Sequence, residues 1–419
     1  MISIPRSALL GFGMFVLMGL IFVGSIHIIR PETKILLRTL MYAPIILIVV
    51  TSFRKYISWR PNWSTLILVA HASIYFLAAI AGRNLWQGVS GFINGPLLML
   101  LLILSLIIYY RDRGPRSLLL TGLFFSTVLS LTSVAITFGL LNVDYYSYQD
   151  NELIGASGEA TFSRVTGVYA NPNTLGILFS LQVALLCYYL KIADGKLMKV
   201  VSTAMLAATV LGVLATASRA SILMTLLVMF AYIFTATDLK TKMYFFAIMF
   251  GFAALSIVFN DYTFLIQRLS SNALTGRDEV WRKAFSIISQ NPYFGLGPGQ
   301  SNFKGPDGIV VSAHNYYIQL AVESGVIATG IFILFLAYIL IISFKKIVIS
   351  GRVDAPMQFC FAYFVGLFAH QIFEVSGFSS YSIQGIVFII AAAYVCSKTS
   401  TDVRRSVFTP RPYQPSVPR

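Results

Sequence analysis

The stretch GVIATGIFILFLAYILIIS at residues 325–343 decides the fold class, because it runs for nineteen residues without one charged side chain. A helix of that length crosses the ~30 Å hydrocarbon core of a bilayer. Similar apolar runs occupy residues 8–29, 35–53, 64–82, 93–110, 117–140, 173–190, 198–216, 220–236, 243–260, 356–373 and 381–397. We therefore expect an all-α polytopic membrane protein with about twelve transmembrane helices. The first run lacks a small-x-small cleavage site, so we expect it to be an uncleaved helix.

Composition and charge agree with this fold class and predict its orientation. Hydrophobic residues make up 57% of the 419 residues and charged residues 11%, whereas about a quarter of a soluble domain is charged. With both termini in the cytoplasm, 20 of the 31 Lys and Arg residues fall in cytoplasmic loops. The basic charge then reflects topology and attraction to anionic membrane lipids, and we expect no nucleic-acid partner. This orientation places the two longest loops on the extracytoplasmic side, where we expect the active site.

The loops divide the chain into four parts. Residues 1–260 hold the first nine helices with short loops and a periplasmic loop at 141–172, and residues 261–324 form a large, partly helical periplasmic loop. Residues 325–397 hold the last three helices, and residues 398–419 are expected to be a disordered cytoplasmic tail. A long loop in an otherwise economical membrane protein usually carries function.

Two amphipathic helices are predicted inside the long loop. Residues 275–278 have the spacing of a capping box, and an apolar helical face follows until Asn291 and Pro292. A second helix is predicted to open at residues 312–315 and to bend into the next span at Gly325. Both helices are expected to lie at the membrane surface over the bundle.

One histidine and three arginines on the periplasmic side are candidates for chemistry. His314 is predicted in the first turn of a helix, where the dipole favours the neutral imidazole that a general base requires. Arg277 opposes the dipole of its own helix, which makes sense if both bind an anion such as phosphate. Arg219 lies in a minimal turn between two apolar helices, and Arg164 precedes a predicted cap at Asn171. A capping surface histidine and an arginine that snorkels to the interface are the bland alternatives.

Other polar motifs have simpler interpretations. His27, His71 and His370 are expected to be packed or hydrogen-bonded residues, and the glycines at 295–299 are expected to form a turn. The exposed pair Arg282 and Lys283 is expected on a solvated face. Cys187, Cys360 and Cys396 fall inside predicted spans without metal-ligand spacing. We expect neither a metal ion nor another cofactor.

A neutral histidine with two or three arginines suits a lipid-linked diphosphate substrate. The arginines would hold the diphosphate leaving group while the base deprotonates an incoming hydroxyl. Because arginine neutralises the leaving group, such a group transfer can proceed without a metal ion.

The order and spacing of several motifs over about residues 160–345 resemble the O-antigen ligase/polymerase superfamily. The motifs are Arg164-x-x-Gly167, Asn171-Pro172-Asn173, Ser218-Arg219-Ala220, Thr275-Gly276-Arg277 with Trp281, Asn291-Pro292-x-x-Gly295-x-Gly297-x-Gly299, and His314-Asn315-x-x-x-Gln319 with Glu323-x-Gly325. Ala328 departs from the Gly, Thr or Tyr that family ligases often have at this position. The resemblance implies His314 as catalytic base and Arg219 and Arg277 as diphosphate ligands. The remaining matched polar residues, implied as substrate contacts, are Arg164, Asn171, Asn173, Asn315 and Glu323.

The resemblance further implies an inverting glycosyltransferase without a metal or nucleotide sugar. It also implies a bacterial inner-membrane location, with the active site facing the periplasm. Its donor would be a glycan on undecaprenyl diphosphate and its acceptor the lipid A–core oligosaccharide of lipopolysaccharide, as in an O-antigen ligase. The alternatives within the superfamily are an O-antigen polymerase and a protein O-oligosaccharyltransferase. A flippase or transporter of lipid-linked sugar is the alternative from a different class. Transporters usually place charges at mid-membrane, whereas here nearly all charges lie at the predicted boundaries.

Overall fold

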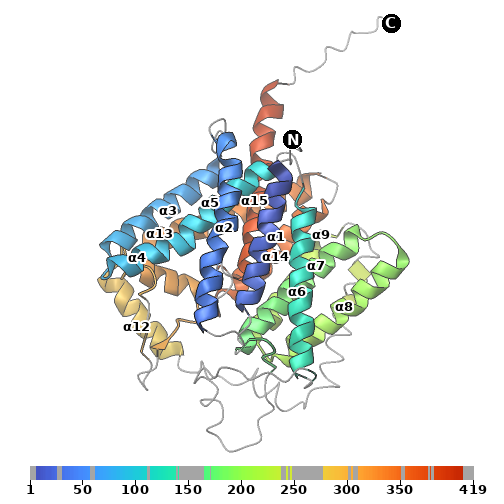
Figure 1. Ribbon diagram of the computed structural model, residues 1–419, viewed down its shortest axis with the longest axis horizontal. Helices are drawn as coiled ribbons and strands as arrows, with labels where there is room; N and C mark the ends of the chain where they lie inside the picture. Colours follow the sequence, from blue (N-terminus) through green and yellow to red (C-terminus); the bar gives the residue numbers. More distant parts are fainter. Residues whose placement is uncertain are drawn as a thin grey trace, which may run out of the picture.

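A computed structural model gives the arrangement of the chain as a helical bundle (Figure 1). It describes residues 6–25, 31–56, 62–110, 114–137, 140, 165–169, 171–236, 242–243, 246–247, 277–300, 303–304, 310–350, 354–375, 378 and 382–408. The helices are α1 (Arg6–Ser25), α2 (Pro31–Tyr56), α3 (Trp63–Ala81), α4 (Leu85–Phe92), α5 (Leu98–Tyr109), α6 (Arg116–Thr137), α7 (Pro172–Ile192), α8 (Lys196–Ala215), α9 (Arg219–Thr235), α12 (Arg277–Gln290), α13 (Tyr316–Ser350), α14 (Ala355–His370) and α15 (Ile383–Phe408). A π-helical turn, η1 (Ile93–Leu97), joins α4 to α5, and β1 (Phe303–Lys304) pairs antiparallel with β2 (Val310–Val311).

The predicted all-α membrane fold is confirmed. Within the described residues six helices are long and apolar enough to cross a membrane, and shorter apolar helices accompany them. Eleven of the twelve predicted spans coincide with a helix, sometimes shifted by a few residues. The twelfth, at 243–260, lies almost wholly outside the described residues, so the number twelve stays a prediction.

One predicted span begins eight residues earlier than expected and contains a distortion. Asn84 caps α4 by accepting a hydrogen bond from the backbone N–H of Gln87, so the helical segment starts at Leu85. Pro96 has no N–H to donate, and the backbone widens into η1 around it before continuing as α5. The predicted disordered tail is also wrong in its first part, because α15 continues to Phe408. No proline or glycine interrupts that segment until Pro410.

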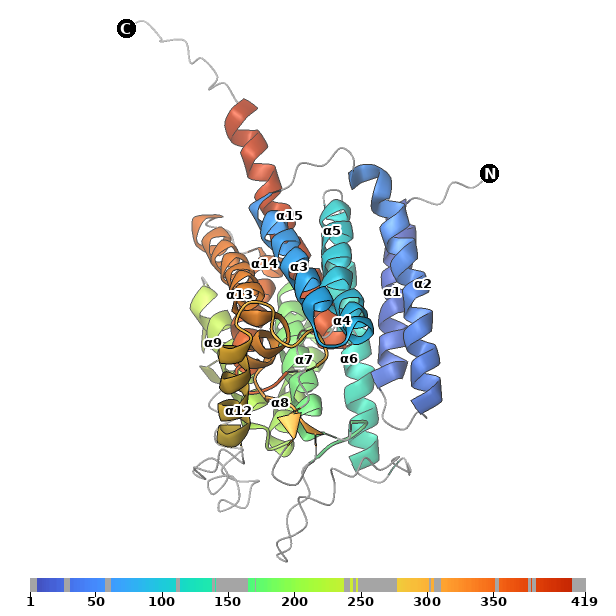
Figure 2. The same ribbon diagram turned by 90° about the vertical axis from the view of Figure 1, so that its left-hand side faces the viewer.

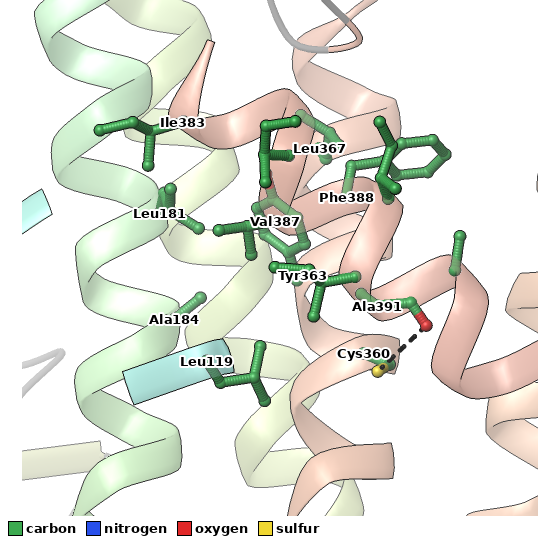
Figure 3. Close-up of a cluster of buried hydrophobic side chains, with 14 of the residues drawn as sticks. Leu119, Leu181, Ala184, Cys360, Tyr363, Leu367, Ile383, Val387, Phe388 and Ala391 are labelled. Atoms are coloured by element: carbon green, nitrogen blue, oxygen red, sulfur yellow. Dashed lines mark hydrogen bonds between the residues drawn. The ribbon is translucent and has the colours of Figure 1, made fainter. Parts of the chain in front are cut away.

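The core lies where α7, α14 and α15 meet, with α6 against them. Figure 3 shows Leu181 of α7, Tyr363 of α14, and Val387 and Phe388 of α15 directed into one buried cluster. Close packing of large side chains gains dispersion energy in a bilayer, where the hydrophobic effect between helices is weak. The positions of the α7 and α14 ends, which matter for the site, therefore follow from this core.

The two ends of the bundle differ. The N-terminal end of α1 and the C-terminal end of α15 lie at the same end, while α12 lies at the opposite end in both views (Figures 1 and 2). This arrangement agrees with an even number of crossings between α1 and α15. The end that holds α12 also holds the candidate site.

The loop that contains α12 is attached to the bundle through glycine contacts. Gly325, with φ of 78°, bends α13 where the sequence predicted a bend, and a Cβ there would lie 2.1 Å from the carbonyl oxygen of Tyr293. The turn at 295–299 donates Leu296 N–H and Gly297 N–H to the carbonyls of Val322 and Glu323. α12 ends at Gln290, as predicted from the Asn-Pro pair.

Candidate functional site

One carboxylate, Glu374, joins three of the predicted site residues. Its Oε1 lies 3.6 Å from an Arg277 guanidinium nitrogen and accepts a 2.6 Å hydrogen bond from Asn173 Nδ2. Its Oε2 lies 3.6 Å from His314 Nδ1. The side chain of Glu374 is only 8% exposed, so its negative charge depends on these partners for compensation. Residues from α7, α12 and the loop before α13 thus meet at the turn that follows α14.

His314 lies outside the helix in which it was predicted. Asn315 is the cap, since its Oδ1 accepts the N–H of Ile318 at 3.0 Å, and α13 begins at Tyr316. His314 precedes that cap with φ of 47°, an uncommon conformation for a residue other than glycine. The neighbouring Ala313 carbonyl accepts a 2.8 Å hydrogen bond from Trp281 Nε1 of α12. The capping asparagine and this indole, rather than a helical turn, therefore orient the imidazole.

The geometry at His314 suits a general base. At 3.6 Å the Nδ1–Glu374 contact is an ion-pair distance beyond hydrogen-bond length, and Nδ1 has no other hydrogen-bond partner among the described residues. A carboxylate on this side favours the tautomer with a proton on Nδ1, which leaves the lone pair on Nε2. The side chain is 36% exposed, so a substrate can approach it.

Arg277 is the first residue of α12 and is only 23% exposed. Burial lowers the pKa of its guanidinium, the Glu374 carboxylate raises it, and the positive charge of Arg219 lowers it again. The last effect places the two arginines within electrostatic reach of each other. In this structure the carboxylate of Glu374 holds the place beside Arg277 where an anion was predicted.

Arg219 is the first residue of α9 and is exposed. Ser218 caps the helix, and Ala217 before it has φ of 47°. Ala217 and His314 are the two residues other than glycine with positive φ among those the structure describes. Such strain concentrates at functional sites, and here one strained residue is the candidate His314 and the other lies two residues before the candidate Arg219.

The remaining predicted contacts separate into three groups. Asn171 caps α7 as expected, with its Oδ1 accepting the N–H of Asn173 at 2.8 Å, and Asn173 reaches Glu374. Glu323 belongs to a different set of contacts, because it accepts hydrogen bonds from Tyr75 OH at 3.3 Å and from Gln319 Nε2 at 3.1 Å. Arg164 and the expected capping box at Thr275 lie outside the described residues.

The alternative interpretations hold for several other residues. Arg282 and Lys283 form i,i+4 ion pairs with Asp278 and Glu279 on an exposed helix face, as expected. His71 is buried, and its Nδ1 lies 3.0 Å from the Ala328 carbonyl oxygen. Across the described part of the chain, no group of three or more His, Cys, Asp or Glu side chains gathers as metal ligands would.

Glu374 is the residue that sequence reasoning missed. It follows the apolar run at 356–373 as a lone acid at the predicted boundary of a span, and such a position is unremarkable in one dimension. Glu374 is far from Arg277 and Asn173 in the sequence, so the sequence alone does not reveal their contacts. The available signal was an acid at the end of a predicted span, on the same predicted side as the three candidate arginines.

A comparison with family models supports the same region. Residues 204–333 match a family model described as O-antigen ligase. The matched segment includes Arg219, Arg277 and His314 but excludes Asn173 and Glu374. No curated protein matches the chain.

Proposed function

The chain belongs to an O-antigen ligase-type family through residues 204–333, and we propose that it is an O-antigen ligase. It would transfer a glycan from undecaprenyl diphosphate to a hydroxyl of the lipid A–core oligosaccharide, on the periplasmic face of the inner membrane. The observation that supports this most is the convergence of His314, Arg277 and Glu374 at one end of an apolar bundle, with Arg219 in electrostatic reach.

The proposed reaction makes one bond and breaks one at the anomeric carbon, and it moves one proton. His314 Nε2 takes the proton of the acceptor hydroxyl, whose oxygen attacks the anomeric carbon and inverts its configuration. The bond from that carbon to the diphosphate oxygen breaks, and the electron pair leaves with the diphosphate. Arg277 and Arg219 stabilise the developing charge, while Glu374 stabilises the imidazolium that forms.

Glu374 has a second role in this scheme, because it compensates Arg277 before the donor binds. The carboxylate neutralises a guanidinium that is three-quarters buried and close to a second cation. When a diphosphate arrives, its oxygens offer Arg277 a bidentate partner, and Glu374 remains on His314. Glu374 thus couples binding of the diphosphate at Arg277 to activation of His314 as the base.

The experiment that tests the proposal supplies purified protein with undecaprenyl-diphosphate glycan and lipid A–core in the presence of EDTA. Glycan on the core supports a ligase, whereas longer lipid-linked chains would indicate a polymerase and glycan on Ser or Thr an oligosaccharyltransferase. Movement of intact lipid-linked glycan across a vesicle membrane, without transfer, would indicate a flippase. A strict requirement for a divalent metal would contradict the mechanism.

Matched variants locate the activity. His314→Ala and Arg277→Ala are expected to lose transfer by at least about 10²-fold. Arg282→Ala removes an arginine five residues further along α12, whose side chain is 77% exposed, and is expected to keep transfer activity. Full activity in His314→Ala would remove that residue from the mechanism.

A further inference from the structure

A buried histidine below the site is not used by the mechanism. His370, the last residue of α14, is fully buried together with Gln371 and Ser221. Its Nδ1 lies 3.2 Å from Gln371 Nε2, and its Nε2 lies 3.5 Å from Ser221 Oγ. Both ring nitrogens therefore have a polar neighbour, on opposite sides of the imidazole.

These contacts select one form of the ring. An amide nitrogen only donates, so Nδ1 accepts from Gln371, and the proton of a neutral imidazole lies on Nε2. Nε2 then donates to Ser221 Oγ, which in turn donates to Ser218 Oγ at 3.0 Å. The three hydrogen bonds run in one direction, from the end of α14 to the start of α9.

The chain of hydrogen bonds ends at Ser218, the N-cap residue of α9, which directly precedes Arg219. Ser218 Oγ also accepts the backbone N–H of Ser221, and α9 begins with Arg219 directly after Ser218. Ser221 has little freedom to move, because a Cβ on Gly176 of α7 would lie 2.4 Å from its Oγ. The donor that reaches Ser221 is thus one hydrogen bond away from the cap of α9.

Residues 370–374 are therefore connected to both arginines of the site, to Arg277 directly and to Arg219 through other residues. Glu374 contacts Arg277 directly, and His370 reaches the turn of Arg219 through Ser221 and Ser218. A diphosphate carries its charges on two adjacent phosphorus centres, so binding it with two arginines requires a set spacing between them.

We propose that His370 is a positioning residue, which acts through Ser221 and Ser218 to hold Arg219 at the distance from Arg277 that a diphosphate requires. The identity of the anion in this inference rests on the proposed function. The chain of hydrogen bonds from His370 to Ser218 is independent of that function.

The experiment measures the affinity of inorganic pyrophosphate for full-length protein by calorimetry. His370→Leu removes both nitrogens and is expected to weaken binding about tenfold, the effect of one buried hydrogen bond. His370→Gln places an amide donor near the former Nε2 and is expected to bind within about twofold of wild type. Ser221→Ala is expected to match His370→Leu, and the double variant to be no weaker than either single one.

A structural control separates positioning from stability. Leu367→Ala, three residues earlier on α14 and fully buried, is expected to lower the thermal stability but to leave pyrophosphate affinity unchanged. In transfer assays His370→Leu is expected to raise the donor KM while kcat changes little. If affinity falls in Leu367→Ala in proportion to stability, or if His370→Gln binds as weakly as His370→Leu, the proposal is wrong.

The ring itself provides a readout that is independent of function. In NMR spectra of protein with ¹⁵N-labelled histidine, the His370 signal is identified as the one that disappears in His370→Gln. Its shifts are expected to be those of a neutral ring protonated on Nε2. A proton on Nδ1 would overturn the proposed direction of the chain. If wild-type protein fails to bind pyrophosphate, the proposed function is contradicted. Two measurements then still test whether His370 holds the turn. One is the tautomer of its ring, and the other is the interaction energy between His370 and Ser221 in a double-mutant cycle of unfolding free energies.

Discussion

The contacts of Glu374 predict that one substitution will raise the affinity for diphosphate and lower the rate of glycan transfer. Glu374→Gln removes the negative charge but keeps the shape and an oxygen that can accept from Asn173. Arg277 then loses its counter-charge, and His314 loses the carboxylate on Nδ1. We expect the variant to bind diphosphate more tightly and to transfer glycan more slowly.

The magnitude follows from the distance and the burial. Two unit charges 3.6 Å apart attract by about 4–5 kcal/mol at an effective dielectric constant of about 20. Desolvation offsets most of this attraction, which leaves about 1–1.5 kcal/mol of competition with the ligand. Removing it should tighten pyrophosphate binding about tenfold. Loss of the partner of the base should lower kcat about 10²-fold or more.

The assay combines pyrophosphate calorimetry with transfer kinetics on purified protein. Glu279→Gln is the matched control, because that acid pairs with Lys283 on an exposed face and should change neither quantity. If Glu374→Gln binds pyrophosphate no more tightly and transfers at the wild-type rate, Glu374 is a structural residue and the reasoning about the site fails. Weaker binding would show that the carboxylate orders Arg277 rather than competing for it.

Three further changes test neighbouring contacts. Arg277→Lys keeps the charge but loses the planar fork, so the donor KM should rise about tenfold with retained folding, as measured by transfer kinetics and thermal unfolding. Trp281→Phe leaves the buried Ala313 carbonyl without its 2.8 Å donor, so kcat should fall about tenfold, and a full rate would show that this bond does not orient His314. Gly325→Ala places a Cβ 2.1 Å from the Tyr293 carbonyl oxygen at φ of 78°. It should lower the unfolding free energy by at least about 1–3 kcal/mol in a denaturant titration, and wild-type stability would mean that the α13 bend relaxes freely.

The parts of the fold that depend on local sequence were predictable. Uncharged runs define membrane helices because every backbone group must be satisfied within the segment. Caps such as Asn171 with Pro172, and the stop at Asn291 and Pro292, were predicted because a cap acts within four residues. The tail was misjudged because its four prolines begin only at residue 410, and composition averaged over 398–419 concealed a helix-compatible start.

The site was predictable only in part. Arg219, Arg277 and His314 are visible in the sequence because charged residues at helix ends on one face are unusual. The helix was expected to include His314 in its first turn, but its cap is Asn315, so His314 lies in a strained position before the helix. Competing cap candidates at 312–315 differ by little free energy locally, and packing against α12 decides between them.

By itself, the sequence determined the membrane fold and several helix ends, since these follow from hydrophobicity along the chain and from local capping. It also singled out Arg219, Arg277 and His314 as candidates. Only the tertiary structure decided that Glu374 faces His314, Arg277 and Asn173, and that His370 reaches the cap of α9. Such contacts join positions 60 to about 200 residues apart, and nothing local in the chain encodes them. They arise because the packed core of α7, α14 and α15 fixes where each helix ends.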